Sequence, residues 1–160
     1  MHKTKNDLPE KVRHQVIGLL QDRLADCIDL TQQAKQAHWN VKGPSFIALH
    51  ELFDKVYGNA GDSADLLAER IVQLGGIAEG TVRTVAKRSS LQEYSLTIAA
   101  GKDHVEALAR ALAFVGEQVR SGINKMTEIG DAGTADILTE ISRALDKDLW
   151  FVEAHGQAER

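Results

Sequence analysis

No proline follows Pro44 in this 160-residue chain, so most of its length lacks the strongest helix breaker. Apolar residues recur every three or four positions along four long stretches, which is the spacing of one face of an α-helix. These stretches end near Ala37, Gly75, Gly130 and Gly156. The sequence therefore predicts an all-α protein folded as a four-helix bundle.

The first two helices have recognisable boundaries. The first is predicted to begin at a capping box, Asp7 to Glu10, with Pro9 in its first turn, and to reach about Ala37. The second follows the break at 43–45 and ends at Gly75, with a glycine-rich middle at 58–62. Each glycine costs a helix about 1 kcal/mol relative to alanine, so two shorter helices are the alternative. We expect one continuous helix.

A long connection separates the second helix from the third, which runs from about Asp103 to Ile129. Thr134 is predicted to cap the fourth helix. The connector, 75–100, carries a second capping box at 90–93, which predicts a short extra helix near 91–94. Extended, it reaches about 85 Å, whereas a 28-residue helix is roughly 42 Å long. The second and third helices are therefore expected to run in the same direction, as in the crossover form of the bundle.

Composition narrows the class of protein further. Residues 1–160 are the length of a single domain, with 1–7 as an N-terminal tail, and the net charge of -4 gives no polycationic character. The single cysteine, Cys27, excludes a disulfide framework and is expected in the core. The apolar runs are too short to span a bilayer and the N-terminus lacks the apolar segment of an export signal, so we expect a cytoplasmic protein. Trp150 and Phe151 are expected to pack the end of the last helix.

Five residues capable of binding a metal ion lie in one part of the sequence. They are His38, His50, Asp54, Asp65 and Glu69. The last four form two pairs with a spacing of four residues, so each pair projects from one face of a helix. The eleven residues between the pairs correspond to about 1,100° of rotation, which returns to within about 20° of the starting direction. All four side chains thus share one stripe of the second helix, flanked by the apolar residues Phe53, Ala64 and Ile71.

Distance prevents the two pairs from holding the same ion within one chain. Eleven residues of helix span roughly 16 Å, whereas bonds from a metal to oxygen or nitrogen are about 2 Å long. Either there are two half-sites, or a second copy of the helix lies antiparallel to the first. A two-fold axis through the glycine-rich centre would place one pair of each chain opposite the other pair of its partner. This predicts two identical metal sites per dimer.

The ligand chemistry leaves several metals open. Imidazole with carboxylate suits Fe(II), Mn(II) or Zn(II) rather than Ca(II). Trp39, beside His38, is a candidate electron donor for redox chemistry, although a tryptophan there also serves simple packing. Charged residues at four-residue spacing are also typical of a solvated helix face. The alternative is therefore a helical bundle whose acids and histidines lie on the surface and bind no metal.

Residues 36–76, QAHWNVKGPSFIALHELFDKVYGNAGDSADLLAERIVQLGG, resemble the signature of the Dps family, the bacterial mini-ferritins. Residues 134–151, TADILTEISRALDKDLWF, are similar to the last helix of that family. The resemblance covers about 15–155. It implies a ferritin-like four-helix bundle whose long crossover carries a short extra helix, and assembly of twelve subunits into a hollow shell.

The resemblance also implies an activity and its residues. Members of the family are ferroxidases: they oxidise Fe(II), preferentially with hydrogen peroxide, and store ferric oxyhydroxide. Its ligands correspond to His38, His50 and Asp54 of one chain and to Asp65 and Glu69 of the two-fold partner, and its iron-side tryptophan corresponds to Trp39. An acidic pore for iron entry at the three-fold axis is implied near the start of the last helix, with the candidates Asp131, Asp136, Glu140 and Asp146.

DNA binding is an open alternative. In relatives that bind DNA a lysine-rich tail makes the contact, and this tail offers Lys3 and Lys5. Twelve chains, each with a net charge of -4, give a shell with a net charge of about -48. Such a shell repels phosphate unless the tails project freely. A nucleoid-associated protein that condenses DNA, with iron chemistry secondary, is therefore the alternative to an iron-oxidising and iron-storing enzyme that protects the cell from oxidative stress.

Overall fold

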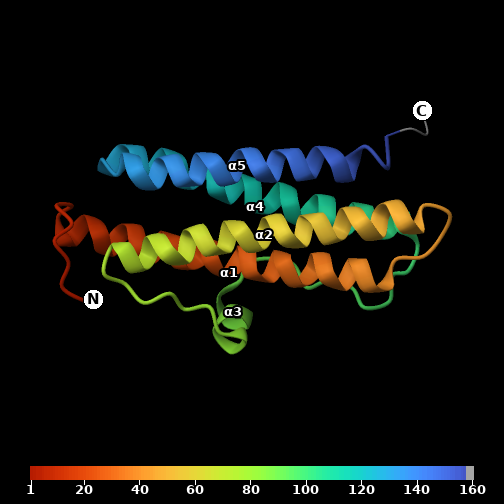
Figure 1. The fold of residues 1–160 in the computed structure, drawn as a ribbon, viewed down its shortest axis with the longest axis horizontal. Helices are drawn as coiled ribbons and strands as arrows, with labels where there is room; N and C mark the ends of the chain where they lie inside the picture. The colour runs from red at the N-terminus through yellow and green to blue at the C-terminus, as the bar shows by residue number, and fades with distance from the viewer. Residues whose placement is uncertain (158–160) are drawn as a thin grey trace.

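The structure is a computed structural model, which describes residues 1–157. Four long helices form the bundle: α1 (Glu10–Asn40), α2 (Phe46–Gln73), α4 (Gly101–Ile129) and α5 (Ala132–Glu153). A short helix, α3 (Val82–Arg88), lies in the connection between α2 and α4. In Figure 1, α1 and α2 lie side by side, α4 and α5 form the second pair, and α3 lies outside the bundle against α1.

The crossover predicted from the connector length is confirmed. Both α2 and α4 run from the end of the bundle that holds the α1–α2 loop toward the opposite end (Figure 1). The connection between them returns along the outside of the bundle and passes through α3. Within the described residues no helix is both long and apolar enough to cross a bilayer.

The bundle core consists of the apolar faces that the helical spacing predicted. Its largest fully buried side chains come from all four long helices: Leu20, Leu24, Leu30, Phe53, Leu67, Ile71, Leu74, Leu108, Leu112, Met126, Leu138 and Ile141. Cys27 is fully buried, as expected. Burying one such side chain contributes roughly 1.5–3 kcal/mol, so these faces are the main source of the bundle's stability.

The second helix is continuous through its glycine-rich middle, so the alternative of two shorter helices is wrong. It ends where predicted, since Gly75 follows its C-cap and has a φ of 88°. The third long helix ends in the same way at Gly130, whose φ is 85°. Positive φ is costly for residues with a Cβ, which explains why glycine occupies both positions.

Two predicted helix caps differ from the structure. The side chain of Asp7 does not cap α1, because Pro9 itself occupies the N-cap and its carbonyl accepts the first helical hydrogen bond, from Arg13. Thr134 is not the cap of α5 but lies in its first turn. The cap is Asp131, whose carboxylate accepts hydrogen bonds from the Thr134 backbone N–H at 3.0 Å and from its hydroxyl at 2.5 Å.

The predicted short helix lies in a different part of the connector. Residues 91–94 are not helical, and the helix is α3, which ends at Arg88. Contacts with α1 replace the capping box: the Ser90 backbone N–H donates to the Asp26 carboxylate at 2.8 Å. The Gln33 amide then donates to the Gln92 carbonyl at 3.0 Å. Tertiary hydrogen bonds to α1 thus hold this segment in a non-helical conformation.

The prediction for the end of the last helix is half wrong. Trp150 is 62% exposed and packs little of α5. Phe151 is half-buried, and its ring centroid lies 4.9 Å from that of Trp150. Trp150 therefore faces outward from the chain.

Both ends of the crossover are tied to the bundle by hydrogen bonds. Near its start, Gln21 of α1 donates to the Ile77 carbonyl at 2.6 Å and accepts from the Glu79 backbone N–H at 3.1 Å. Near its end, the backbone of Lys42, in the α1–α2 loop, donates to Ala99 at 2.9 Å and accepts from Gly101 at 3.2 Å. The second contact anchors the crossover beside the loop that separates the two candidate histidines.

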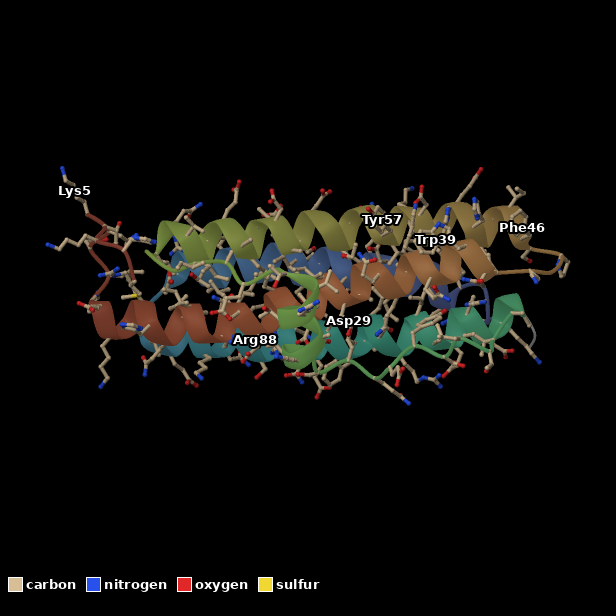
Figure 2. The ribbon with its side chains drawn as sticks, turned by 90° about the horizontal axis from the view of Figure 1, so that it is seen from below. Lys5, Asp29, Trp39, Phe46, Tyr57 and Arg88 are labelled. Atoms are coloured by element: carbon tan, nitrogen blue, oxygen red, sulfur yellow. The ribbon has the colours of Figure 1, made fainter. Side chains whose placement is uncertain are left out.

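The N-terminal tail folds back onto the end of α2. The backbone N–H of His2 donates to the Gly75 carbonyl at 2.7 Å. A Cβ on Gly75 would lie 2.6 Å from the His2 carbonyl oxygen, so only glycine allows this approach. The side chains of Lys3 and Lys5 remain exposed, and Figure 2 shows Lys5 pointing away from one end of the molecule.

Candidate metal centre

His38, near the end of α1, and His50, on α2, hold each other through reciprocal hydrogen bonds. The Nδ1 atom of His38 lies 2.7 Å from the His50 carbonyl oxygen, and the Nδ1 atom of His50 lies 2.9 Å from the His38 carbonyl oxygen. Their rings are stacked, with centroids 3.7 Å apart and planes inclined by 20°. The structure therefore brings together two histidines that the sequence separates by twelve residues.

These hydrogen bonds determine the proton positions on both rings. A carbonyl oxygen only accepts, so Nδ1 of each neutral imidazole carries the proton. Each Nε2 is then left with its lone pair, which is the form of histidine that binds metal ions. A backbone carbonyl on the other ring nitrogen is the usual partner that orients a ligating histidine.

Asp54 lies one turn after His50 and is exposed, but it is already paired with a cation. The Lys35 ammonium, from α1, forms an ion pair with the Asp54 carboxylate and lies 4.5 Å from the centre of the Tyr57 ring. The hydrogen bond from Lys35 lowers the pKa of Asp54 from its ordinary value of 3.8, and the two nearby histidines add to this effect. Asp54 is therefore an anion that can bind a metal ion once Lys35 releases it.

Asp65 and Glu69 lie further along the same exposed face of α2. Neither carboxylate forms an ion pair with another described residue. The continuity of α2 places Asp65 roughly 16 Å from Asp54, as the helical rise requires. Among residues 1–157 no group of three or more His, Cys, Asp and Glu side chains is arranged to hold a metal ion. The described chain thus does not bring the five candidate residues together in one place.

Trp39 follows His38 and is 64% exposed, so it is not core packing within this chain. Figure 2 shows Trp39, Phe46 and Tyr57 near the same end of the molecule, on α1 and α2. The Phe46 ring lies 5.2 Å from the His50 ring and borders the stacked histidines. The candidate centre therefore has exposed aromatic side chains around the two histidines.

The acids proposed for an iron-entry pore fall into two groups. Asp131 is buried, where it caps α5 and pairs with Arg70 at 2.9 Å. Asp146 is exposed and pairs with Arg120 at 2.9 Å. Asp136 and Glu140 are exposed and form no ion pair among the described residues. Only the last two therefore have carboxylates free to meet an incoming cation within the described chain.

Two features of the site were absent from the sequence-based prediction. Lys35 was not expected to pair with Asp54, and the mutual hydrogen bonding of the histidines depends on backbone carbonyls that no side-chain pattern reveals. The position of Lys35, three residues before His38, was the available signal, since that spacing places both side chains on one helix face.

Comparison with known proteins shows close relatives. The model of the ferritin-like domain family matches residues 17–160. The DNA protection during starvation protein of Agrobacterium fabrum is 48% identical, over 98% of this chain and 96% of the relative. The protein of the same name from Mycolicibacterium smegmatis is 35% identical, over 92% of this chain and 80% of the relative.

Solved structures that are similar to this chain also include Dps proteins. The structure of Dps from Microbacterium arborescens in the high iron form is 34% identical, covers 92% of this chain and 96% of that chain, and superposes with a TM-score of 0.87. Dps from Mycobacterium smegmatis, in a tetragonal form, is 35% identical, covers 96% of this chain and 93% of that chain, and has a TM-score of 0.91.

Proposed function

This chain belongs to the Dps family of ferritin-like proteins, and we propose that it oxidises Fe(II) at sites shared between two copies of the chain and stores the ferric product. The observation that carries the proposal is the division of the ligands. His38, His50 and Asp54 lie at one end of α2, whereas Asp65 and Glu69 lie roughly 16 Å away on the same exposed face. An antiparallel second copy completes both sets at once.

The ligands suit ferrous iron and its oxidation. The carboxylates offset the charge of the ions, and the imidazole Nε2 atoms supply softer donors that favour Fe(II). Two Fe(II) ions bind the shared site, and hydrogen peroxide accepts one electron from each. The O–O bond breaks and, with two protons, two water molecules form, so no hydroxyl radical is released. Trp39, beside His38, is the proposed donor for any further electron.

Lys35 supplies a positive charge to Asp54 before iron binds. Its ammonium neutralises the carboxylate, so Asp54 is not left as an unpaired charge when two chains associate. An arriving Fe(II) replaces the ammonium at Asp54. Lys35 keeps its contact with the Tyr57 ring, which stabilises the released cation close to the site.

Iron reaches the interior of the proposed twelve-subunit shell through an acidic entry near the start of α5. Asp136 and Glu140 carry this role because their carboxylates are exposed and one helical turn apart. Asp131 and Asp146 contribute to the electrostatic potential while paired with Arg70 and Arg120. The ferric product is stored inside the shell as oxyhydroxide, which removes both iron and peroxide from the surrounding cytoplasm.

A complementation experiment tests whether the site is shared. One variant carries His50→Ala with Asp54→Ala, and the other carries Asp65→Ala with Glu69→Ala. Each variant alone should lose Fe(II) oxidation by peroxide, because every site lacks two of its five ligands. Unfolding and reassembling the two together at equal amounts should restore about a quarter of the wild-type rate, since half of random dimers are mixed and each has one intact site.

The control mixes each variant with itself after the same treatment and should show no recovery. Circular dichroism of each variant should match the wild type, because the replaced carboxylates are exposed and His50 is only half-buried, outside the apolar core. Full activity of either variant alone would refute the ligand assignment. Failure of the mixture to regain activity, with mixed dimers detected by mass spectrometry, would show that the site is not built from two chains.

DNA binding is proposed as a second function on the exposure of Lys3 and Lys5, and the relatives named for DNA protection support it. The tail backbone is held at Gly75, so the lysines present charge from a docked segment rather than from a free one. A gel shift should weaken steeply with salt. It should disappear on deletion of residues 1–6 and also in Lys3→Gln with Lys5→Gln, which keeps the docked tail. A shift that survives both changes would exclude the tail as the contact.

A further inference from the structure

Tyr94 and His104 form a hydrogen-bonded pair on the side of the bundle where the crossover meets α4. Tyr94 belongs to the crossover, and His104 lies in the first turn of α4. The Tyr94 hydroxyl oxygen lies 2.7 Å from Nδ1 of His104, and the two ring centroids are 6.0 Å apart. His104 is 1% exposed, whereas Tyr94 is half-buried and borders an open groove between the crossover and α4. The pair therefore links the bundle interior to its surface.

In this hydrogen bond the phenol donates and the imidazole accepts. An imidazole nitrogen is a stronger base than a phenol oxygen, and the Tyr94 hydroxyl forms no other hydrogen bond among the described residues. Burial raises the pKa of Tyr94 above its ordinary value of 10.0 and lowers the pKa of His104 below its ordinary value of 6.5. At neutral pH the phenol thus keeps its proton, and Nδ1 keeps the lone pair that can receive it.

The second ring nitrogen of His104 determines where an accepted proton can go. Nε2 carries the ring proton when Nδ1 accepts, and it lies buried with no hydrogen-bond partner among residues 1–157. A buried polar atom without a partner is costly, so its presence calls for an explanation. No described hydrogen bond leads from Nε2 toward solvent, so a proton accepted at Nδ1 stays within the pair and can return to Tyr94.

The pair packs against the residue that precedes a candidate iron ligand. The Phe53 ring, on α2, is fully buried, and its centroid lies 6.4 Å from that of His104. Asp54 follows Phe53 in the chain. Close-packed side chains therefore connect the backbone that holds Asp54 to His104, and His104 to Tyr94.

The other aromatic side chains near the candidate ligands have a different environment. Trp39 is 64% exposed, and Tyr57 is 37% exposed with the Lys35 ammonium over its ring. The Tyr57 hydroxyl forms no hydrogen bond with a described residue. Removal of an electron from tyrosine releases the phenol proton, and a positioned base that takes this proton favours the reaction. Of the two tyrosines in the chain, Tyr94 is the one that has such a base.

We propose that Tyr94 supplies the second electron when hydrogen peroxide meets a shared site that holds a single Fe(II) ion. The inference rests on the proposed function, which supplies both the iron and the peroxide. Fe(II) gives one electron and becomes Fe(III), and Tyr94 gives the other and becomes a neutral tyrosyl radical. The O–O bond breaks, two hydroxide ions form, and the phenol proton moves to Nδ1 of His104.

The pair returns to its starting state when more iron arrives. The next Fe(II) at the site gives one electron to the tyrosyl radical, and His104 returns the proton to the Tyr94 oxygen. Without this donor, a single Fe(II) would supply only one of the two electrons that peroxide needs, and the other product would be a hydroxyl radical. Tyr94 thus extends the protection to sites that are only partly filled.

Freeze-quench electron paramagnetic resonance of the full-length assembled protein tests the proposal. Tyr57→Phe is the background variant, because it leaves Tyr94 as the only tyrosine and keeps a ring beneath the Lys35 ammonium. Anaerobic protein with one Fe(II) per site, mixed with peroxide, should give a tyrosyl signal that narrows when the protein contains ring-deuterated tyrosine. In D2O, electron–nuclear double resonance should detect a deuteron that His104 donates to the radical oxygen.

Two further variants in the Tyr57→Phe background separate an electron donor from a structural contact. Tyr94→Phe should give no tyrosyl signal, and spin trapping should detect severalfold more hydroxyl radical. His104→Asn places an amide oxygen near the position of Nδ1, where it accepts the hydrogen bond but is not a base. The tyrosyl yield should then fall by about an order of magnitude or more. A pair that only braces the crossover would leave the hydroxyl-radical yield unchanged in both variants.

Each outcome supports or overturns a stated part of the proposal. Absence of the tyrosyl signal in Tyr57→Phe, while its Fe(II) is oxidised, would overturn the role of Tyr94 and leave the proposed function standing. Absence of the coupled deuteron would overturn the role of His104, and this measurement does not depend on the folding of His104→Asn. Failure of the wild-type protein to oxidise Fe(II) with peroxide would overturn the proposed function and the role of Tyr94 with it.

Discussion

Two helix faces in this molecule carry polar side chains at helical spacing, and they differ in what lies opposite them. On α1, the face that contains Asp26, Asp29 and Gln33 is covered by the crossover, and each of these side chains forms a hydrogen bond with a residue of the crossover. On α2, the face that contains Asp65 and Glu69 is exposed, and neither residue forms an ion pair within the described chain.

The covered face of α1 holds the crossover by hydrogen bonds to its backbone and to one of its side chains. Asp26 is fully buried, pairs with Arg23 at 3.0 Å and accepts a hydrogen bond from the Ser90 backbone. Asp29 accepts a hydrogen bond from the Ser89 hydroxyl at 2.6 Å. Figure 2 shows Asp29, on α1, and Arg88, at the end of α3, at the place where α3 passes over α1. Buried polar groups of this kind stabilise a fold only while their partners are present.

The role of a polar helix face depends on what lies opposite it. Spacing alone makes the two faces look similar, because both repeat every three or four residues. The distinguishing property is whether the chain has a segment that returns to cover the face. The crossover covers α1, whereas no described segment covers the face of α2 that carries Asp65 and Glu69, so that face is open to a second chain or a cation.

The largest expected effect is on the free energy of unfolding, which should depend on the face of α1 and not on the face of α2. Asp26→Ala should lower the free energy of unfolding by about 3 kcal/mol, because the buried Arg23 loses its counter-charge. Asp54→Ala should leave it close to the wild-type value, because that carboxylate is exposed. Denaturant unfolding followed by circular dichroism measures both values.

Iron oxidation should respond in the opposite order. Asp54→Ala should nearly abolish it, whereas Asp26→Ala should retain it at temperatures where the variant is folded. Equal stability losses in the two variants would contradict the contrast between the faces. So would loss of oxidation in a folded Asp26→Ala protein.

A smaller effect concerns the pH dependence of stability. Burial raises the pKa of Asp26 above 3.8, so the folded state binds this proton more tightly than the unfolded state does. Relative to Asp26→Asn, the wild-type protein should therefore gain stability as pH falls from above the raised pKa to 3.8. For Asp54, whose pKa the Lys35 hydrogen bond lowers, stability relative to Asp54→Asn should instead be lost as pH falls below 3.8.

Thermal unfolding of the wild type and the two asparagine variants across this pH range checks both signs. The Asp54 effect should be the smaller of the two, since that side chain is exposed and screened by solvent. A parallel trend for both aspartates would show that burial does not distinguish them.

The sequence predicted those features that depend on local periodicity. The continuous α2, the crossover and the stripe of candidate ligands follow from 3.6 residues per turn and from the connector length. The structure contains all three, whereas the role of the stripe as metal ligands stays a prediction. Helical rise alone also showed that Asp54 and Asp65 cannot bind the same ion within one chain.

The features that the sequence did not predict depend on distant contacts. The capping box at 90–93 gives way to hydrogen bonds with Asp26 and Gln33, which come from a helix about 60 residues earlier in the chain. The Asp7 box fails because Pro9 already occupies the N-cap. Trp150 was expected to pack inside the chain, but it faces outward from α5.

The backbone pairing of Lys42 with Ala99 and Gly101 places the far end of the crossover against the loop between His38 and His50. The length of that connection therefore sets the geometry of a loop on which the spacing of the two imidazoles depends. An insertion or deletion between α3 and α4 would be transmitted mechanically to the histidine pair, although none of the altered residues touches it. Variation in the length of the crossover is thus a means of adjusting the histidine pair from a distance.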